Sequence, residues 1–163
     1  MVTNISHSPA ETLALGESWG RNVPAGMVIG LRGDLGAGKT QLVKGLARGL
    51  GISARVLSPT FALLNVYEDG RLPLFHLDLY RLDTPEQIRA AGLDEYLSPK
   101  GITVVEWAER WFGENPGQAV FFDQRAPSGT VGAPIAPPRI LRWVEIESIS
   151  ESERRISYED FGS

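Results

Sequence analysis

One eight-residue segment constrains the fold of this chain more than any other feature. It reads Gly33-Asp34-Leu35-Gly36-Ala37-Gly38-Lys39-Thr40 and matches the P-loop pattern G-x-x-x-x-G-K-[ST]. A compact apolar run over residues 26–32 precedes it, and apolar residues with helical spacing follow it over residues 39–50. A buried strand that enters a helix through a glycine-rich turn is the context that this pattern requires. The segment therefore predicts an α/β fold built around a parallel sheet.

The residue types in this segment suit the binding of nucleotide phosphates. Glycines let backbone N–H groups converge on phosphate oxygens, which a Cβ atom would obstruct. The helix N-terminus adds a positive dipole end, Lys39 can reach the β- and γ-phosphates, and the Thr40 hydroxyl can ligate Mg²⁺. A glycine-rich turn that binds no ligand is the alternative interpretation. Because the only lysines are Lys39, Lys44 and Lys100, the chain has no Asn/Thr-Lys-x-Asp guanine signature, which favours ATP over GTP.

Other local patterns predict the remaining elements of the domain. Strands are expected over residues 2–6, 61–68, 72–80, 102–106, 140–147 and 154–159, and helices over residues 9–20 and 85–91. The expected strands 61–68 and 72–80 form a hairpin through Asp69-Gly70, and the last two strands form an antiparallel pair. We expect one domain over residues 1–163 with a long Gly/Pro-rich loop at 113–139. The predicted architecture is a three-layer, P-loop NTPase-like fold with a central, largely parallel sheet and antiparallel strands at its edges.

Composition narrows the classes of function. The chain has 16 Lys and Arg residues against 20 Asp and Glu residues, which gives a net charge of −4. This balance argues against a nucleic-acid coat or an anionic membrane surface as the main partner. Cysteine is absent, which excludes disulfides, zinc–thiolate sites and cysteine nucleophiles. No apolar run approaches the roughly 18 residues of a transmembrane helix, so we expect a soluble, cytoplasmic protein without a membrane partner.

Two acidic residues are candidates for the carboxylate that a P-loop enzyme needs beside its Mg²⁺. Glu106 ends the buried run Ile102-Thr-Val-Val, and Asp78 lies on the expected strand 72–80. Thr60, in Ser58-Pro59-Thr60-Phe61, lies where many P-loop proteins sense the γ-phosphate. Each also has a purely structural interpretation, as a solvated strand end or a proline turn. His76, Trp107 and Arg154 are weaker candidates, for which core or surface roles are the more common case.

Six motifs follow one another along residues 8–112. They are Glu11-Thr12 with Leu15-Gly16, the P-loop segment at 33–40, Ser-Pro-Thr-Phe at 58–61, His-Leu-Asp-Leu-Tyr-Arg at 76–81, Gly-Leu-Asp-Glu-Tyr-Leu at 92–97 and Val-Glu-Trp at 105–107. In this order they resemble the TsaE (YjeE) family of small bacterial P-loop ATPases. The chain departs from the family at Ala108, where proline is common, and in the length and Pro/Gly content of 113–139.

The resemblance implies a slow, Mg²⁺-dependent ATPase that is required for the threonylcarbamoyladenosine modification of tRNA. It implies action on a TsaD–TsaB complex, with tRNA contacted only through that complex. Carried over by position, the phosphates of ATP or ADP are wrapped by Gly36, Ala37, Gly38, Lys39, Thr40 and Gln41. Thr40 and Glu106 serve Mg²⁺, Asp78, Glu106 and Thr60 take part in hydrolysis and nucleotide sensing, and Thr12 lies near the nucleotide.

Two other functions remain open at the level of sequence. The first is a P-loop small-molecule kinase, which usually carries an arginine-rich lid. The lid-sized segment at 113–139 contains only Arg125 and Arg139, so this alternative is weaker. The second is a nucleotide-binding module without turnover, against which the two carboxylates Asp78 and Glu106 argue.

Overall fold

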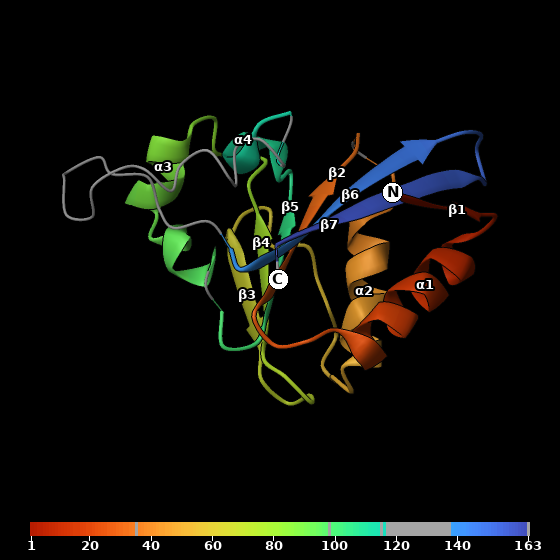
Figure 1. Ribbon diagram of the computed structural model, residues 1–163, viewed down its shortest axis with the longest axis horizontal. Helices are drawn as coiled ribbons and strands as arrows, with labels where there is room; N and C mark the ends of the chain where they lie inside the picture. Colours follow the sequence, from red (N-terminus) through yellow and green to blue (C-terminus); the bar gives the residue numbers. More distant parts are fainter. Residues whose placement is uncertain (35, 98, 115, 117–137, 163) are drawn as a thin grey trace.

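Seven strands form one mixed sheet in the described part of the chain (Figure 1). The computed structural model describes residues 1–34, 36–97, 99–114, 116 and 138–162. In chain order the elements are β1 (Val2–Ser6), α1 (Pro9–Asn22), β2 (Met27–Arg32), α2 (Lys39–Gly49), β3 (Leu64–Tyr67), β4 (Leu74–Asp78), α3 (Pro85–Ala90), the 3₁₀ turn η1 (Leu93–Leu97), β5 (Ile102–Glu106), α4 (Glu109–Phe112), β6 (Ile140–Ser148) and β7 (Arg154–Gly162). None of the helices in the described ranges is long and apolar enough to cross a membrane.

The sheet is parallel at its centre and antiparallel at its edges. The strand order is β1-β7-β6-β2-β5-β4-β3. Strand β2 pairs in parallel with β5 and β6, and β4 pairs in parallel with β5. The outer pairs β3–β4, β6–β7 and β1–β7 are antiparallel. The expected largely parallel sheet with antiparallel edges is therefore confirmed.

Helices cover both faces of the sheet, which makes the expected three layers. Figure 1 shows α1 and α2 on one side and α3 and α4 on the other. The first face packs Leu42 and Leu46 of α2 against Ile29 and Val104 of the sheet. The second face packs Ile88 of α3 into a separate cluster that includes residues of η1 and α4. Strand β2 is buried on both faces, which is why its sequence reads as a continuous apolar run.

The sheet register brings the carboxyl ends of three parallel strands together. Glu106 at the end of β5 is paired with Leu31 near the end of β2 and with Asp78 at the end of β4. Ligands of open α/β sheets bind beyond the carboxyl ends of the strands. The register therefore sets the position of the chain's functional cleft.

Helices α1 and α2 touch through their backbones. Gly16 and Gly20 of α1 face Gly45 and Gly49 of α2. A Cβ atom added to Gly45 would lie 2.1 Å from the carbonyl oxygen of Leu13, and one added to Gly49 would lie 2.1 Å from that of Glu17. Glycine is thus required here by the close approach of two helices, and the contact fixes α2 against the rest of the domain.

The hairpin strands are shorter than the sequence pattern predicted. Strands were expected over 61–68 and 72–80, but β3 begins at Leu64 and β4 ends at Asp78. Leu63 has a φ of 68° and donates its N–H to the Pro59 carbonyl at 2.6 Å, so the chain turns before β3 begins. After β4, the Asp78 carboxylate accepts the N–H of Tyr80 at 2.9 Å and ends the strand. Of the Gly/Pro-rich loop expected at 113–139, residues 115 and 117–137 lie outside the described residues.

Replacing Gly45 by Ala tests the α1–α2 contact. In an exposed helix this change stabilises by about 1 kcal/mol through helix propensity. Here the new methyl group meets a backbone carbonyl, so we expect a net loss of about 1–3 kcal/mol in the free energy of unfolding. Urea unfolding of the variant measures it. Lys44→Ala, at the exposed position just before Gly45, is the matched control and should change the free energy of unfolding by less than about 0.5 kcal/mol. A more stable Gly45→Ala variant contradicts the packing.

Candidate nucleotide-binding site

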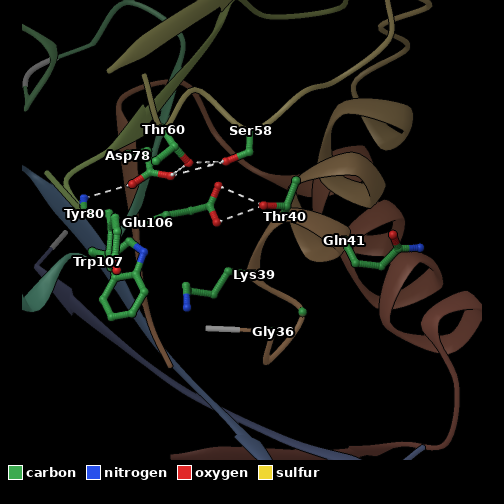
Figure 2. A pocket seen from close by; sticks show the side chains of 11 residues that line it. Gly36, Lys39, Thr40, Gln41, Ser58, Thr60, Asp78, Tyr80, Glu106 and Trp107 are labelled. Carbon is green, nitrogen blue, oxygen red and sulfur yellow. Dashed lines mark hydrogen bonds between the residues drawn. The ribbon is translucent and has the colours of Figure 1, made fainter. Parts of the chain in front are cut away.

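A cleft of about 270 Å³ lies at the carboxyl ends of β2, β5 and β4 (Figure 2). The P-loop turn and the first residues of α2 form one wall, and the ends of β4 and β5 form the other. Its lining residues are Gly36, Gly38, Lys39, Thr40, Gln41, Ser58, Thr60, Asp78, Tyr80, Glu106 and Trp107. Segments far apart in the sequence thus converge on one cleft.

The P-loop turn presents backbone N–H groups to this cleft. Gly36 and Gly38 have φ angles of 80° and 104°, which side chains rarely adopt, and a Cβ atom built on either meets nothing within 4 Å. The N-cap of α2 is Gly38 itself, which offers no side chain to cap the first turn. The first N–H groups of a helix have no partner within the helix. The open space and the uncapped helix start together suit an anion.

Lys39 supplies a buried positive charge next to this turn. Its residue is only 5% exposed, and its Nζ donates to the carbonyl oxygens of Gly33 and, at 2.8 Å, of Asp34. The ammonium lies 4.1 Å from the centre of the Trp107 ring. Burial lowers the pKa of Lys39 below its ordinary value, and nearby carboxylates, Glu106 first among them, oppose this shift. A buried cation with carbonyl partners alone is well placed for a phosphate.

Thr40 and Glu106 join the P-loop helix to the end of β5. The Thr40 Oγ1 donates toward both carboxylate oxygens of Glu106, at 3.0 Å to Oε1 and 3.2 Å to Oε2. The Nε2 of His76, a residue with no exposed surface, lies 2.5 Å from Oε2 of the same carboxylate. Figure 2 shows the Glu106 side chain reaching across the cleft toward Thr40.

Asp78 forms a second polar group on the same wall. Its Oδ2 accepts hydrogen bonds from Thr60 Oγ1 at 3.0 Å and from Ser58 Oγ at 3.3 Å. Its Oδ1 accepts the N–H of Tyr80. The carboxylate therefore ties the segment that carries Ser58 and Thr60 to the end of β4, as Figure 2 shows.

The cleft contains most, but not all, of the residues predicted as a nucleotide site. Ala37 is buried within the P-loop turn, and its carbonyl oxygen accepts a hydrogen bond from Arg154 Nε at 3.1 Å. Thr12 lies on α1, is 3% exposed and hydrogen-bonds to Ser6 Oγ at 2.7 Å, so it does not line the cleft. Its predicted proximity to a nucleotide stays a prediction.

Two lining residues, Ser58 and Tyr80, were not predicted as site residues, and a third, Trp107, was a weaker candidate. Ser58 lies two residues before Thr60, and Tyr80 lies two residues after Asp78, so the two-residue period of an extended chain was the available signal. Trp107, a weaker candidate, has a φ of 60° and packs against Tyr80 with ring centres 5.1 Å apart. A bulky residue in this backbone conformation is strained, which is typical of functional sites.

The oxygen groups of the cleft fit Mg²⁺ that arrives with a nucleotide. Among the described residues, no three His, Cys, Asp or Glu side chains are arranged to hold a metal ion. The hydroxyl of Thr40 and the carboxylate of Glu106 are hard oxygen donors on opposite sides of the cleft. Mg²⁺ is usually held by one or two protein groups, with phosphates and waters as its remaining ligands.

Comparisons with known proteins agree with one another. The family model "Threonylcarbamoyl adenosine biosynthesis protein TsaE" matches residues 6–127. Three relatives carry the name tRNA threonylcarbamoyladenosine biosynthesis protein TsaE. That of Synechocystis is 50% identical over 58% of this chain and 62% of its own length, and that of Bacillus subtilis 46% identical over 62% and 63%. That of Treponema pallidum is 45% identical over 74% of this chain and 89% of its own length.

The match to a solved structure extends over nearly the whole chain. A crystal structure of Bacillus subtilis YdiB is 31% identical in sequence, with a TM-score of 0.69, and the match covers 96% of this chain and 83% of YdiB. The first curated relatives are matched over less than two thirds of their own length. The family model alone matches well over half of this chain, and the chain therefore belongs to the TsaE family.

Proposed function

We propose that the chain binds ATP with Mg²⁺ in this cleft and hydrolyses it slowly in support of the threonylcarbamoyladenosine modification of tRNA. The observation that carries this proposal is the convergence of Lys39 and Thr40, at the start of α2, with Glu106 and Asp78, at the ends of two parallel strands. The printed description of the family supports the tRNA process. The location that follows from this role is the cytoplasm.

The phosphates are bound by the P-loop. The N–H groups of residue 36 and of residues 38–41 would donate to the phosphates, whereas the Ala37 N–H donates to the Asp34 carbonyl at 3.0 Å. Lys39 would turn from its carbonyl partners to the β- and γ-phosphates. Gln41, whose Nε2 donates to the Pro9 carbonyl at 3.2 Å, lies at the edge of the same turn. The centre of the Trp107 ring lies 4.1 Å from the Lys39 ammonium, and the ring lowers the polarity on this side of the site, which strengthens a charge contact with phosphate.

Thr40 Oγ1 would hold Mg²⁺, and Glu106, which accepts a hydrogen bond from Thr40, would also accept hydrogen bonds from the water shell of the ion. When bound, the ion neutralises charge that develops on the transferred phosphoryl group. Glu106 and Thr40 are already in hydrogen-bond contact, so the pair needs little rearrangement to serve the ion.

Asp78 positions Thr60, and Thr60 acts on the attacking water and the γ-phosphate. Both oxygens of Asp78 are engaged by protein donors, so the carboxylate acts by holding the Thr60 hydroxyl at the cleft. Thr60 then orients the attacking water and registers the γ-phosphate. This division leaves Glu106 as the carboxylate that serves the metal.

Turnover by the isolated chain is slow because the described part of the site provides one cation. Among the described residues that line the cleft, Lys39 alone is positively charged. P-loop enzymes without an arginine finger are slower by a factor of about 10³–10⁵. We propose that a TsaD–TsaB complex supplies or orders the missing group, and that tRNA is reached only through this complex. The net charge of −4 agrees with a protein that acts through other proteins and does not bind tRNA directly.

Removing the Lys39 ammonium tests phosphate binding. A charge-assisted contact of this kind contributes about 2–3 kcal/mol, so Lys39→Ala should weaken ADP binding roughly 30- to 150-fold. Titration calorimetry measures the dissociation constant, and the exposed Lys44→Ala is the control for loss of positive charge. An unchanged dissociation constant in folded Lys39→Ala protein would contradict phosphate binding by the P-loop.

Changing Glu106 to Gln tests the assignment of the metal-serving carboxylate. The variant keeps the size of the side chain, so ADP affinity measured in EDTA should stay within about threefold of wild type, while the ATP hydrolysis rate with saturating Mg²⁺ should fall roughly 100-fold. A steady-state phosphate-release assay gives the rate. If hydrolysis persists at the wild-type rate, the role passes to Asp78.

The partner dependence is tested by steady-state ATPase measurements with and without a TsaD–TsaB pair. We expect the pair to raise the rate by at least about tenfold, and Thr60→Ala to lose most of that rise because the sensing hydroxyl is absent. Thr3→Ala, on β1 at the opposite edge of the sheet, is the matched control. Rapid hydrolysis by the chain alone, unaffected by the pair, contradicts this part of the proposal.

A further inference from the structure

The buried histidine behind Glu106 has no role in the function described so far. His76 lies in the middle of β4, with no exposed surface, and its neighbour in register on β5 is Val104. The ring reaches diagonally across the two strands to Glu106, two residues further along β5. It does not line the cleft, where Glu106 does. His76 is therefore placed to act on the site only through that carboxylate.

The contact fixes which ring nitrogen carries a proton. A carboxylate only accepts hydrogen bonds, so His76 donates from Nε2 to Glu106 Oε2, 2.5 Å away. Its Nδ1 is buried and has no hydrogen-bond partner among the described residues. A buried polar atom without a partner costs free energy that an apolar side chain at this place in β4 would avoid. A purely structural role is thus a poor reason for a histidine here.

The two carboxylate oxygens of Glu106 differ in their hydrogen bonds. His76 contacts Oε2 alone, from within the protein, while Thr40 Oγ1 lies nearer to Oε1, at 3.0 Å, than to Oε2, at 3.2 Å. A carboxylate held at one oxygen cannot rotate about its last bond without breaking that hydrogen bond. Groups that support metal ligands in this way commonly change metal affinity or activity by about 10- to 100-fold when they are removed.

We propose that His76 is a positioning residue that locks the Glu106 carboxylate through Nε2, so that its other oxygen stays turned to Thr40 and to Mg²⁺ bound with a nucleotide. The inference rests on the proposed function, because it assumes that the cleft binds a nucleotide with Mg²⁺. It adds a residue outside the cleft to the groups that set how strongly Mg²⁺ and nucleotide binding are coupled.

The test compares binding of the non-hydrolysable ATP analogue AMP-PNP in Mg²⁺ with its binding in EDTA, by titration calorimetry. For His76→Leu, which keeps bulk and loses the donor, we expect the strengthening by Mg²⁺ to fall about tenfold, with the affinity in EDTA within about twofold of wild type. His76→Gln, whose Nε2 can replace the lost donor, should retain the strengthening within about threefold. His76→Asn, which is one methylene shorter and cannot reach Oε2, should behave as His76→Leu does and replaces it if that variant does not fold.

A double-mutant comparison separates positioning from general damage. In a Glu106→Gln background, His76→Leu should change the Mg²⁺ strengthening by less than about twofold, because the group that it positions is already altered. Equal loss in the Leu and Gln variants, or full additivity with Glu106→Gln, overturns the inference while nucleotide binding stands. Wild-type protein that gains nothing from Mg²⁺ overturns the inference together with the metal assignment.

Discussion

The hydrogen bond between Thr40 and Glu106 joins the two halves of the site, and the rest of the structure determines whether it can form. Thr40 is the second residue of α2, and Glu106 is the last residue of β5. Their contact at 3.0 Å requires the helix start and the strand end to be placed within a fraction of an ångström. Two features of the fold provide this precision. The parallel register aligns the ends of β2, β4 and β5, and the glycine contacts with α1 set the position of α2.

The groups that make the cleft chemically useful are costly to the fold. Lys39, Asp78 and Glu106 are polar or charged side chains, each at most 5% exposed. Buried charges are tolerated when they are hydrogen-bonded, and here each has a specific partner: two carbonyls for Lys39, Thr60 and the Tyr80 N–H for Asp78, Thr40 for Glu106. The positive φ of Trp107 adds backbone strain at the same place. The apolar clusters on both faces of the sheet supply the stability that offsets these costs.

The sequence predicted the parts of this protein that depend on local chemistry. The strands at 2–6 and 102–106 and the helix starts at residues 9 and 85 agree with the structure, because each follows from a local apolar period or from the residues that begin a helix. Contacts between segments far apart in the chain were harder to predict from the sequence. The burial of Thr12 against Ser6 and the ends of β3 and β4 depend on hydrogen bonds that no local sequence pattern shows. The contact of His76 with Glu106 appears only once β4 and β5 are known to be neighbours.

The central claim is that the cleft between α2 and the ends of β4 and β5 binds a nucleotide together with Mg²⁺. A crystal structure of the chain grown with Mg²⁺ and AMP-PNP tests this most directly. We expect the β-phosphate within hydrogen-bond distance of the N–H groups of residues 36 and 38–40, the Lys39 ammonium on the phosphates, and the ion on Thr40 Oγ1 with Glu106 beside it. A nucleotide bound elsewhere, or bound here with its metal away from both Thr40 and Glu106, would contradict it.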